Sequence, residues 1–174
     1  MYSGPIIFIV HSPARWWNAE EPSKATKKAI ENHNNKMLAL IRFANRHNLP
    51  VLFGYSSSEA PKEIIDKIRA PVPIQILGNG GWTTKIRDLL EQHQIKPNKV
   101  LVAGHYKEIC MYSAEMSMRY LFPHSEIIEL RQNFSLSARP GVGFREDNVK
   151  RAEEKERREI FRVKRAKLAR KVLK

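Results

Sequence analysis

Short apolar segments alternate with longer segments of helical periodicity, and this alternation restricts the fold more than any other feature of the chain. Residues 5–10 read PIIFIV, a continuous run that is typical of a central parallel strand covered on both faces. Four more segments are predicted to be strands, at residues 49–55, 74–77, 99–103 and 125–130. Helices are predicted between them, at residues 23–47, 61–69, 84–90 and 108–121.

Residues with special backbone chemistry set the predicted boundaries. Ser23 is predicted to cap the first helix, and Thr83 or Thr84 the third, because a hydroxyl can accept a hydrogen bond from the first helical turn. Pro71 and Pro73 are interpreted as breaks that precede the strand at residues 74–77.

Strands that alternate with helices form βαβ units. We therefore expect a three-layer α-β-α fold with a mainly parallel sheet of about five strands and right-handed crossovers. In such sheets, ligands bind beyond the carboxyl ends of the strands. Those ends carry His11 and residues 55–58, 78–81 and 104–110, which are rich in polar side chains and glycine.

The chain has 174 residues, which suits one domain with a sizeable core. Its single cysteine excludes an internal disulfide framework and favours a reducing compartment, so we expect a cytoplasmic protein. The chain contains no run of about 18 apolar residues, which is the length needed to span a membrane. The first apolar run lacks the preceding basic segment of a signal peptide and is interpreted as a buried strand.

Charge is the unusual part of the composition. Lys and Arg number 31 against 18 Asp and Glu, a net charge of +13. Residues 160–174 carry +7 with no acidic residue, whereas the other 159 residues carry +6. A surplus of this size favours polyanionic partners, such as nucleic acid, a ribonucleoprotein or an anionic membrane surface.

The C-terminal part is predicted to be a separate extension of a domain at residues 1–135. Residues 136–144 are interpreted as a linker, and residues 145–174, which contain no Pro or Gly, as a basic helix. Alternatives to polyanion binding are an inert tail or a dimerisation arm through Phe161, Leu168 and Val172. A membrane partner is not expected, because the apolar face of this helix is thin. The side chains expected to contact nucleic-acid phosphates are Arg162, Lys164, Arg165, Lys167, Arg170, Lys171 and Lys174.

The segment at residues 100–114, VLVAGHYKEICMYSA, resembles the signature of the isochorismatase-like cysteine hydrolases, which include nicotinamidases. The shared features are an apolar strand, a glycine, an acidic residue two positions before a cysteine, and a helix with paired small residues. They are carried here by Gly104, Glu108, Cys110, Ser113 and Ala114. The order of the flanking elements also fits, over roughly residues 5–135, so the resemblance implies an isochorismatase-like α/β fold.

The resemblance also implies hydrolysis of an amide or vinyl ether through an Asp–Lys–Cys triad. A thiolate would be the nucleophile, activated by the start of a helix. Cys110 matches the cysteine, but His11 stands at the aspartate position and residues 78–81, GNGG, stand at the lysine position. Lys85 or Lys107 could replace the lysine, although each is more simply a solvated side chain.

Two interpretations of this segment remain open. Cys110 could be a nucleophile with His11 as its base, because a neutral imidazole can accept the thiol proton. Alternatively, Cys110 is a small buried residue and His11 a loop residue. The further side chains expected to line a substrate pocket are His105, Tyr106, Glu108, Asn79 and Trp16.

The leading hypothesis is a catalytically altered protein of this fold that serves as a basic binding or scaffold protein for RNA, another nucleic acid or a ribonucleoprotein assembly. The alternative is a cysteine hydrolase of a small amide. A third hypothesis is a structural subunit that forms a homo-oligomer. The Asp and paired His that bind metal in nicotinamidases are not matched, so neither a metal nor another cofactor is expected.

Overall fold

The computed structural model describes residues 1–11, 21–55, 62–75, 82–105, 110–130, 134–136, 154–155 and 157–164. The strands are β1 (Pro5–Val10), β2 (Val51–Tyr55), β3 (Pro71–Gln75), β4 (Lys99–His105), β5 (Glu126–Glu129) and β6 (Ser135–Leu136). The helices are α1 (Lys24–Arg46), α2 (Lys62–Ile65), α3 (Thr83–Gln92) and α4 (Tyr112–Leu121). Residues 157–164 are also helical and are called the C-terminal helical segment below.

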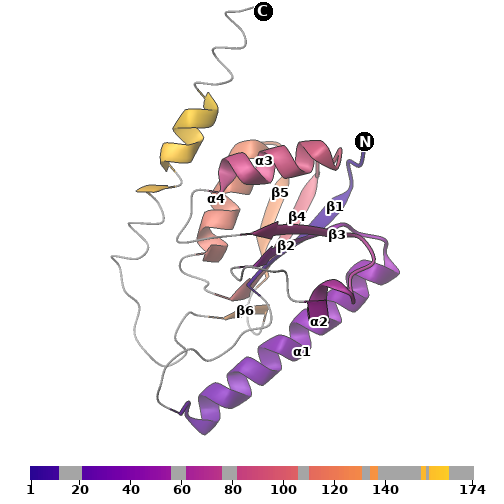
Figure 1. The fold of residues 1–174 in the computed structure, drawn as a ribbon, viewed down its shortest axis with the longest axis vertical. Coiled ribbons are helices and arrows are strands. Elements are labelled where there is room, and N and C mark those ends of the chain that lie inside the picture. Colours follow the sequence, from indigo (N-terminus) through magenta and orange to yellow (C-terminus); the bar gives the residue numbers. More distant parts are fainter. Residues whose placement is uncertain are drawn as a thin grey trace, which may run out of the picture.

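The strands form one sheet in the order β3-β2-β1-β4-β5, and every neighbouring pair is parallel (Figure 1). The short β6 pairs with the end of β4 and is parallel to it. This arrangement confirms the predicted α/β fold with a parallel sheet.

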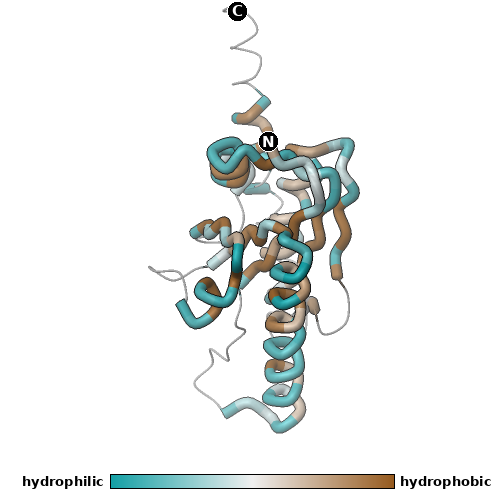
Figure 2. Tube along the Cα trace, turned by 90° about the vertical axis from the view of Figure 1, so that its right-hand side faces the viewer, coloured by the Kyte–Doolittle hydropathy of each residue, from teal (hydrophilic) through white to brown (hydrophobic). Residues whose placement is uncertain are grey.

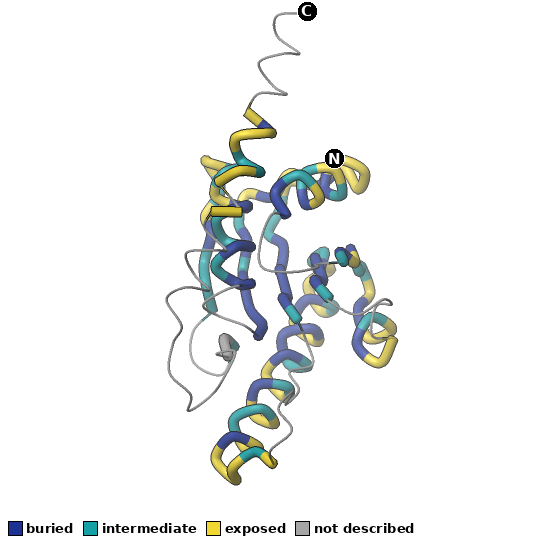
Figure 3. The backbone as a smooth tube through the Cα atoms, turned by 60° about the vertical axis from the view of Figure 1, so that its left-hand side comes forward, coloured by how far each residue is buried: buried dark blue, intermediate teal, exposed yellow. Residues whose placement is uncertain are grey.

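Helices cover both faces of the sheet, so the predicted three layers are confirmed. On one face, Ile7 and Phe53 of the sheet pack with Met37 of α1 in one buried cluster. On the other face, Phe8 packs in a second cluster with side chains of α3 and α4, such as Ile86 and Met118. The strands between the helices are mostly buried (Figure 3).

Helix α1 begins where the sequence predicts. The backbone N–H of Thr26 donates to Oγ of Ser23 at 3.1 Å, which satisfies one of the free donors of the first turn. The buried side chains of α1 recur every three or four positions, and its outer side is hydrophilic (Figure 2). The buried side chains of α1 are those of Thr26, His33, Met37, Leu40, Ile41 and Ala44.

The prediction of strand breaks at Pro71 and Pro73 is wrong, because both residues lie within β3, which begins at Pro71 instead of at Ile74. Residues 76 and 77, at the end of the predicted strand, lie outside the described residues. The sheet order explains why the strand tolerates the two prolines. β3 is an edge strand paired only with β2, and a proline on an edge strand costs no ladder hydrogen bond when its nitrogen faces away from the partner.

The predicted cap of the third helix is also wrong. The residue at the capping position of α3 is Trp82, and it provides no side-chain hydrogen bond. Thr83 donates from Oγ1 to Oγ of Ser117 at 3.0 Å, between α3 and α4. Thr84 donates to Glu159 in the C-terminal helical segment. Both hydroxyls therefore make tertiary contacts instead of a local cap.

The strand β6 was not expected, since its second residue falls where the sequence predicts a linker. Two residues are too few to show a strand pattern, and the pairing with β4 is long-range. None of the helices in the described part of the chain has the length and apolar character needed to cross a membrane.

Candidate functional site

The carboxyl ends of β1 and β4 lie side by side at the centre of the sheet. The chain leaves β1 toward α1 on one face and leaves β4 toward α4 on the other. A parallel sheet binds ligands at such a point, where the strand order reverses. His11 follows β1, His105 ends β4, and Cys110 precedes α4, so three predicted site residues belong to this edge.

Gly104 allows the two strand ends to approach closely. Its φ is +141°, and a Cβ added there would lie 2.0 Å from the carbonyl oxygen of Val10, its register partner. No other residue type fits this contact without a backbone shift, because the obstacle is main chain. The glycine of the matched segment is therefore needed to join β1 and β4 at the edge.

His105 lies on the α1 side of the edge. Its side chain is buried, and its ring centroid is 6.4 Å from that of His33 on α1, with the planes tilted by 50°. His33 is not among the predicted site residues. A signal was present, because His33 falls on the same helical stripe as Met37 and Leu40.

Cys110 lies on the opposite side of the sheet from this histidine pair. It is 5% exposed and packs in the apolar cluster that contains Met111, Ala114 and Val10. Burial raises the pKa of the Cys110 thiol to about 12, because the thiolate would lose its hydration. The group is therefore a neutral thiol near pH 7 in this structure.

His11 adopts an unusual backbone conformation for a residue with a side chain, with φ at +52°. Its backbone N–H donates to the carbonyl oxygen of Gly54 at 2.8 Å, which ties the end of β1 to β2. Burial lowers the pKa of the His11 imidazole to about 4, so the ring is neutral near pH 7. A neutral imidazole can accept a proton, but it does not stabilise a neighbouring thiolate by charge.

The pKa values of Cys110 and His11 determine what chemistry this edge of the sheet can perform. A cysteine nucleophile reacts as the thiolate, and activated cysteines have a lowered pKa. The Cys110 pKa is raised and the His11 pKa is lowered, so both groups are uncharged at neutral pH. Cys110 and His11 are thus a buried thiol and a neutral imidazole rather than a preformed ion pair.

Several predicted residues lie outside the described part of the chain. They include four of the predicted pocket residues and five of the predicted phosphate contacts. The pocket residues are Trp16, Asn79, Tyr106 and Glu108, and the phosphate contacts are Arg165, Lys167, Arg170, Lys171 and Lys174.

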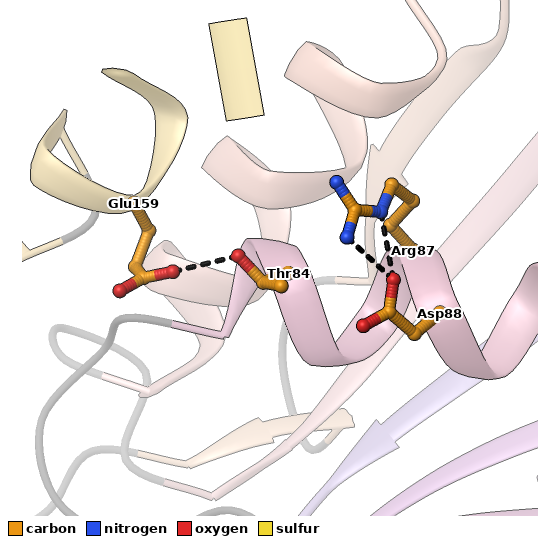
Figure 4. A network of polar contacts seen from close by, with 4 residues as sticks. All are labelled: Thr84, Arg87, Asp88 and Glu159. Atoms are coloured by element: carbon orange, nitrogen blue, oxygen red, sulfur yellow. Dashed lines mark hydrogen bonds and ion pairs between the residues drawn. The ribbon is translucent and has the colours of Figure 1, made fainter. Parts of the chain in front are cut away.

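The C-terminal helical segment packs against α3 and α4. Oγ1 of Thr84 donates to Oε2 of Glu159 at 2.7 Å (Figure 4). Val163 is 1% exposed, and Nζ of Lys164 lies 5.9 Å from the ring centroid of Tyr120 on α4. The segment is thus held by a hydrogen bond, an apolar contact and a cation–π contact.

The two sides of this segment differ in charge. Glu159, Ile160 and Val163 are buried or half-buried on the side toward the domain. Arg162 is exposed, and its Nη1 pairs with Oε1 of Glu159 at 2.7 Å. Arg157 and Arg158 are also exposed on the outer side, where Arg158 pairs with Glu154, whereas the exposed Lys164 lies beside α4 over the Tyr120 ring.

A hollow of about 310 Å³ lies at the opposite edge of the sheet, where the strands begin. Its lining includes the apolar side chains of Leu90, Ile95 and Phe122 and the basic side chains of Arg87 and Lys96. None of the predicted site residues lines it.

Comparison with known proteins gives similarity of fold. No model of a protein family matches the chain, and no curated protein sequence matches it. The structure is similar to that of MAR1 ribonuclease from Caenorhabditis elegans, with a TM-score of 0.52 and 10% identity, over 91% of this chain and 73% of that one. It is also similar to nicotinamidase/pyrazinamidase PncA from Bacillus subtilis, with a TM-score of 0.49 and 13% identity, over 92% and 97% of the two chains. The likeness to MAR1 ribonuclease shows a shared α/β fold, in agreement with the isochorismatase-like fold that the sequence resemblance implies.

Proposed function

We propose that this protein binds nucleic acid, with RNA as the preferred partner, and that its basic C-terminal part contacts the phosphate backbone. It uses the isochorismatase-like α/β domain as a scaffold rather than as a catalyst. Residues 160–174 carry +7 without a single acidic residue. A protein that neutralises phosphates with Lys and Arg releases counterions, and this release supplies affinity independent of sequence.

The sorting of side chains on the C-terminal helical segment is the observation that carries the proposal. Its acidic and apolar side chains, Glu159 and Val163, face the domain and hold the segment in place. Its outer side presents cations such as Arg157 and Arg162 to solvent. Because the segment is already held against the domain, less conformational entropy is lost when it binds a partner. This smaller loss favours binding.

The alternative hypothesis, a cysteine hydrolase, requires a thiolate at Cys110. Burial favours the protonated thiol there, which supports the proposal of a scaffold. The sharing of a fold with enzymes does not transfer their chemistry, because function depends on the residues of the site.

A salt titration of RNA binding tests the proposal. The variant replaces Arg165, Lys167, Arg170 and Lys171 by Gln in the full chain, and affinity for a labelled single-stranded RNA is measured by fluorescence anisotropy. Each lost phosphate contact should reduce the slope of log affinity against log salt by about 0.7, so the slope should fall by up to about 3.

A matched variant tests whether RNA binding depends on where the lost charges lie or only on how many are lost. It replaces four exposed lysines by Gln: Lys62 of α2, Lys67 in the turn after α2, Lys85 of α3 and Lys96 in the segment before β4. The charge removed is the same, but the slope should change by less than about 1. Equal affinity and slope in the wild type and the C-terminal variant would contradict the proposal.

A further inference from the structure

Helix α1 contains most of the positive charge that lies outside the C-terminus. Its 23 residues include six Lys and Arg and one Glu, a net charge of +5. Residues 160–174 carry +7 of the total of +13, so the remaining 136 residues carry only +1. The basic character of the protein is thus confined to two elements, and only one of them belongs to the C-terminal part.

Four of the α1 cations lie in one line along the outer side of the helix. Lys24, Lys28, Arg42 and Arg46 are separated by 4, 14 and 4 positions, which returns each to the same face. At 1.5 Å per residue, the line extends over about 33 Å. We call these four residues the basic stripe.

The basic stripe is exposed, and its charges are not paired within the described part of the chain. All four side chains are exposed, and none forms an ion pair or hydrogen bond with another described residue. The other two cations of α1 have contacts: Lys27 pairs with Glu21, and Lys36 lies over the ring of Phe134 at 5.5 Å.

The positions of Lys24 and Lys28, the N-terminal half of the basic stripe, are not explained by a contribution to the stability of α1. The positive end of the helix dipole lies at the N-terminus, where cations are unfavourable. The first turn of α1 nevertheless lacks an acidic residue, and Lys24 and Lys28 lie near its start. Arg46, in the last turn, is favourable for the helix. An anionic partner would relieve the repulsion at the N-terminal half.

The start of α1 extends beyond the carboxyl edge of the sheet. His33 is level with His105, the last residue of β4, so residues 24–32 lie beyond the strand ends (Figure 1). Lys24 and Lys28 are therefore placed at the rim of the edge where folds of this class bind ligands.

An exposed aromatic side chain accompanies the other half of the stripe. Phe43 is 44% exposed, and its ring centroid lies 4.5 Å from that of His47. Both residues directly follow stripe positions, since Arg42 and Arg46 precede them. Aromatic rings beside cations that track a phosphate backbone are the usual means of binding single-stranded nucleic acid, because bases stack on the rings.

We infer that the basic stripe of α1 and the Phe43 ring form a second surface for single-stranded RNA, separate from the C-terminal part. The inference rests on the proposed function and extends it to another element. Membrane binding fits less well, because a surface helix must bury an apolar face in lipid, and the apolar face of α1 already packs on the sheet. The exposed amides of Asn32 and Asn35 between the two halves can contact phosphate or sugar.

A stripe variant of the full chain tests the inference. It replaces Lys24, Lys28, Arg42 and Arg46 by Gln, and its salt dependence of RNA binding is compared with that of the matched Lys62, Lys67, Lys85 and Lys96→Gln variant. Both lose four charges. The stripe variant should lower the slope by up to about 3, and the matched variant by less than about 1.

A second variant tests the aromatic part of the surface without changing charge. Phe43→Ala should weaken binding of single-stranded RNA on the order of 10-fold, and should weaken duplex binding little, because paired bases are not free to stack. Far-UV circular dichroism and thermal unfolding establish that each variant is folded before binding is compared.

The outcomes separate the inference from the proposed function. If the wild type binds RNA and only the C-terminal variant loses it, the inference fails and the proposed function stands. If the wild type binds no RNA, both fail. Stripe-dependent binding to vesicles of phosphatidylserine, with RNA binding unchanged in the stripe variant, would also overturn the inference and assign α1 to a lipid surface.

Discussion

Thr84 donates a hydrogen bond from Oγ1 to Oε2 of Glu159 at 2.7 Å, across 75 positions of sequence (Figure 4). Thr84 lies in the first turn of α3. This turn contains no acidic residue, and no side chain caps it. The carboxylate of Glu159 therefore supplies, from the C-terminal helical segment, the negative charge that favours a helix N-terminus. The contact links the basic C-terminal part to the domain.

We predict that Thr84 and Glu159 are energetically coupled. The single variants Thr84→Ala and Glu159→Gln and the double variant complete a cycle, measured as free energies of unfolding in urea. A hydrogen bond to a charged group contributes about 1.5–3 kcal/mol, and partial exposure reduces this, so the coupling should be about 1 kcal/mol.

The neighbouring pair Arg87 and Asp88 provides the control for that cycle (Figure 4). Nη2 of Arg87 lies 2.6 Å from Oδ1 of Asp88, but the Asp88 side chain is 59% exposed and the pair is adjacent in sequence. An ion pair of this kind contributes about 0.5 kcal/mol or less. Coupling of Thr84 and Glu159 no larger than this would mean that the segment is not held by their contact.

The apolar contact of the C-terminal helical segment gives a second prediction. Val163 is 1% exposed, whereas Phe161, two positions away, is 61% exposed. Val163→Ala removes two buried methyl groups and should cost about 1.5 kcal/mol of stability. Phe161→Ala should cost less than about 0.5 kcal/mol.

Hydrogen exchange locates the effect of these changes. In Val163→Ala, amides of residues 157–164 should exchange faster than in the wild type, and those of β1 and β4 should be nearly unchanged, because the segment opens locally. Equal exchange in the Val163 and Phe161 variants would contradict the packing of this segment on α3 and α4.

The fold was predictable where the signal is local or strongly periodic. Helix α1 combines a capping serine, Ser23, with 23 residues of one amphipathic pattern, and its predicted limits are confirmed. β1 is a continuous apolar run, and its central position in the sheet is confirmed. β3 was misplaced because only its position at the sheet edge makes Pro71 and Pro73 acceptable.

The candidate site was less predictable, because it depends on contacts between distant segments. Nothing near Thr84 in the sequence indicates Glu159 as its partner. The separation of Cys110 and His105 by the sheet follows from strand register, which one sequence does not reveal. By contrast, the position of Cys110 between β4 and α4 follows from the matched segment alone.

The raised pKa of Cys110 predicts slow alkylation and a loss of stability at high pH. In the unfolded chain the thiol ionises near pH 9, whereas in the folded protein it stays protonated up to about pH 12. Between these values the unfolded state binds fewer protons, so stability should fall as the pH rises through this window. Cys110→Ala should remove that part of the pH dependence.

Iodoacetamide provides the kinetic measurement for Cys110. Alkylation of the native protein at pH 7 should be slower than that of the urea-unfolded chain, in which the thiol is accessible and less perturbed. Faster alkylation of the native protein would show a thiolate at Cys110 and would support the hydrolase alternative instead.

His11 should make the stability rise with pH in the acidic range, whereas Cys110 should make it fall with pH in the alkaline range. Its folded pKa is lowered to about 4 by burial, whereas the unfolded imidazole titrates near 6.5. Between these values the unfolded state binds more protons, so His11 contributes stability that is complete above pH 6.5 and is lost as the pH falls to about 4. His11→Asn should flatten this part of the curve, and asparagine suits the site because it tolerates a φ of +52°.

The exposed His93 provides the matched substitution for His11. His93→Asn removes an exposed imidazole in place of a buried one, so a slope that flattens in the His11 variant alone assigns the effect to the buried ring of His11. Titration of the imidazole protons by NMR measures the His11 pKa directly. A His11 pKa near 6.5 would mean that the ring is solvated at the sheet edge, and a neighbouring acid–base role for it would then become more favourable than a structural one.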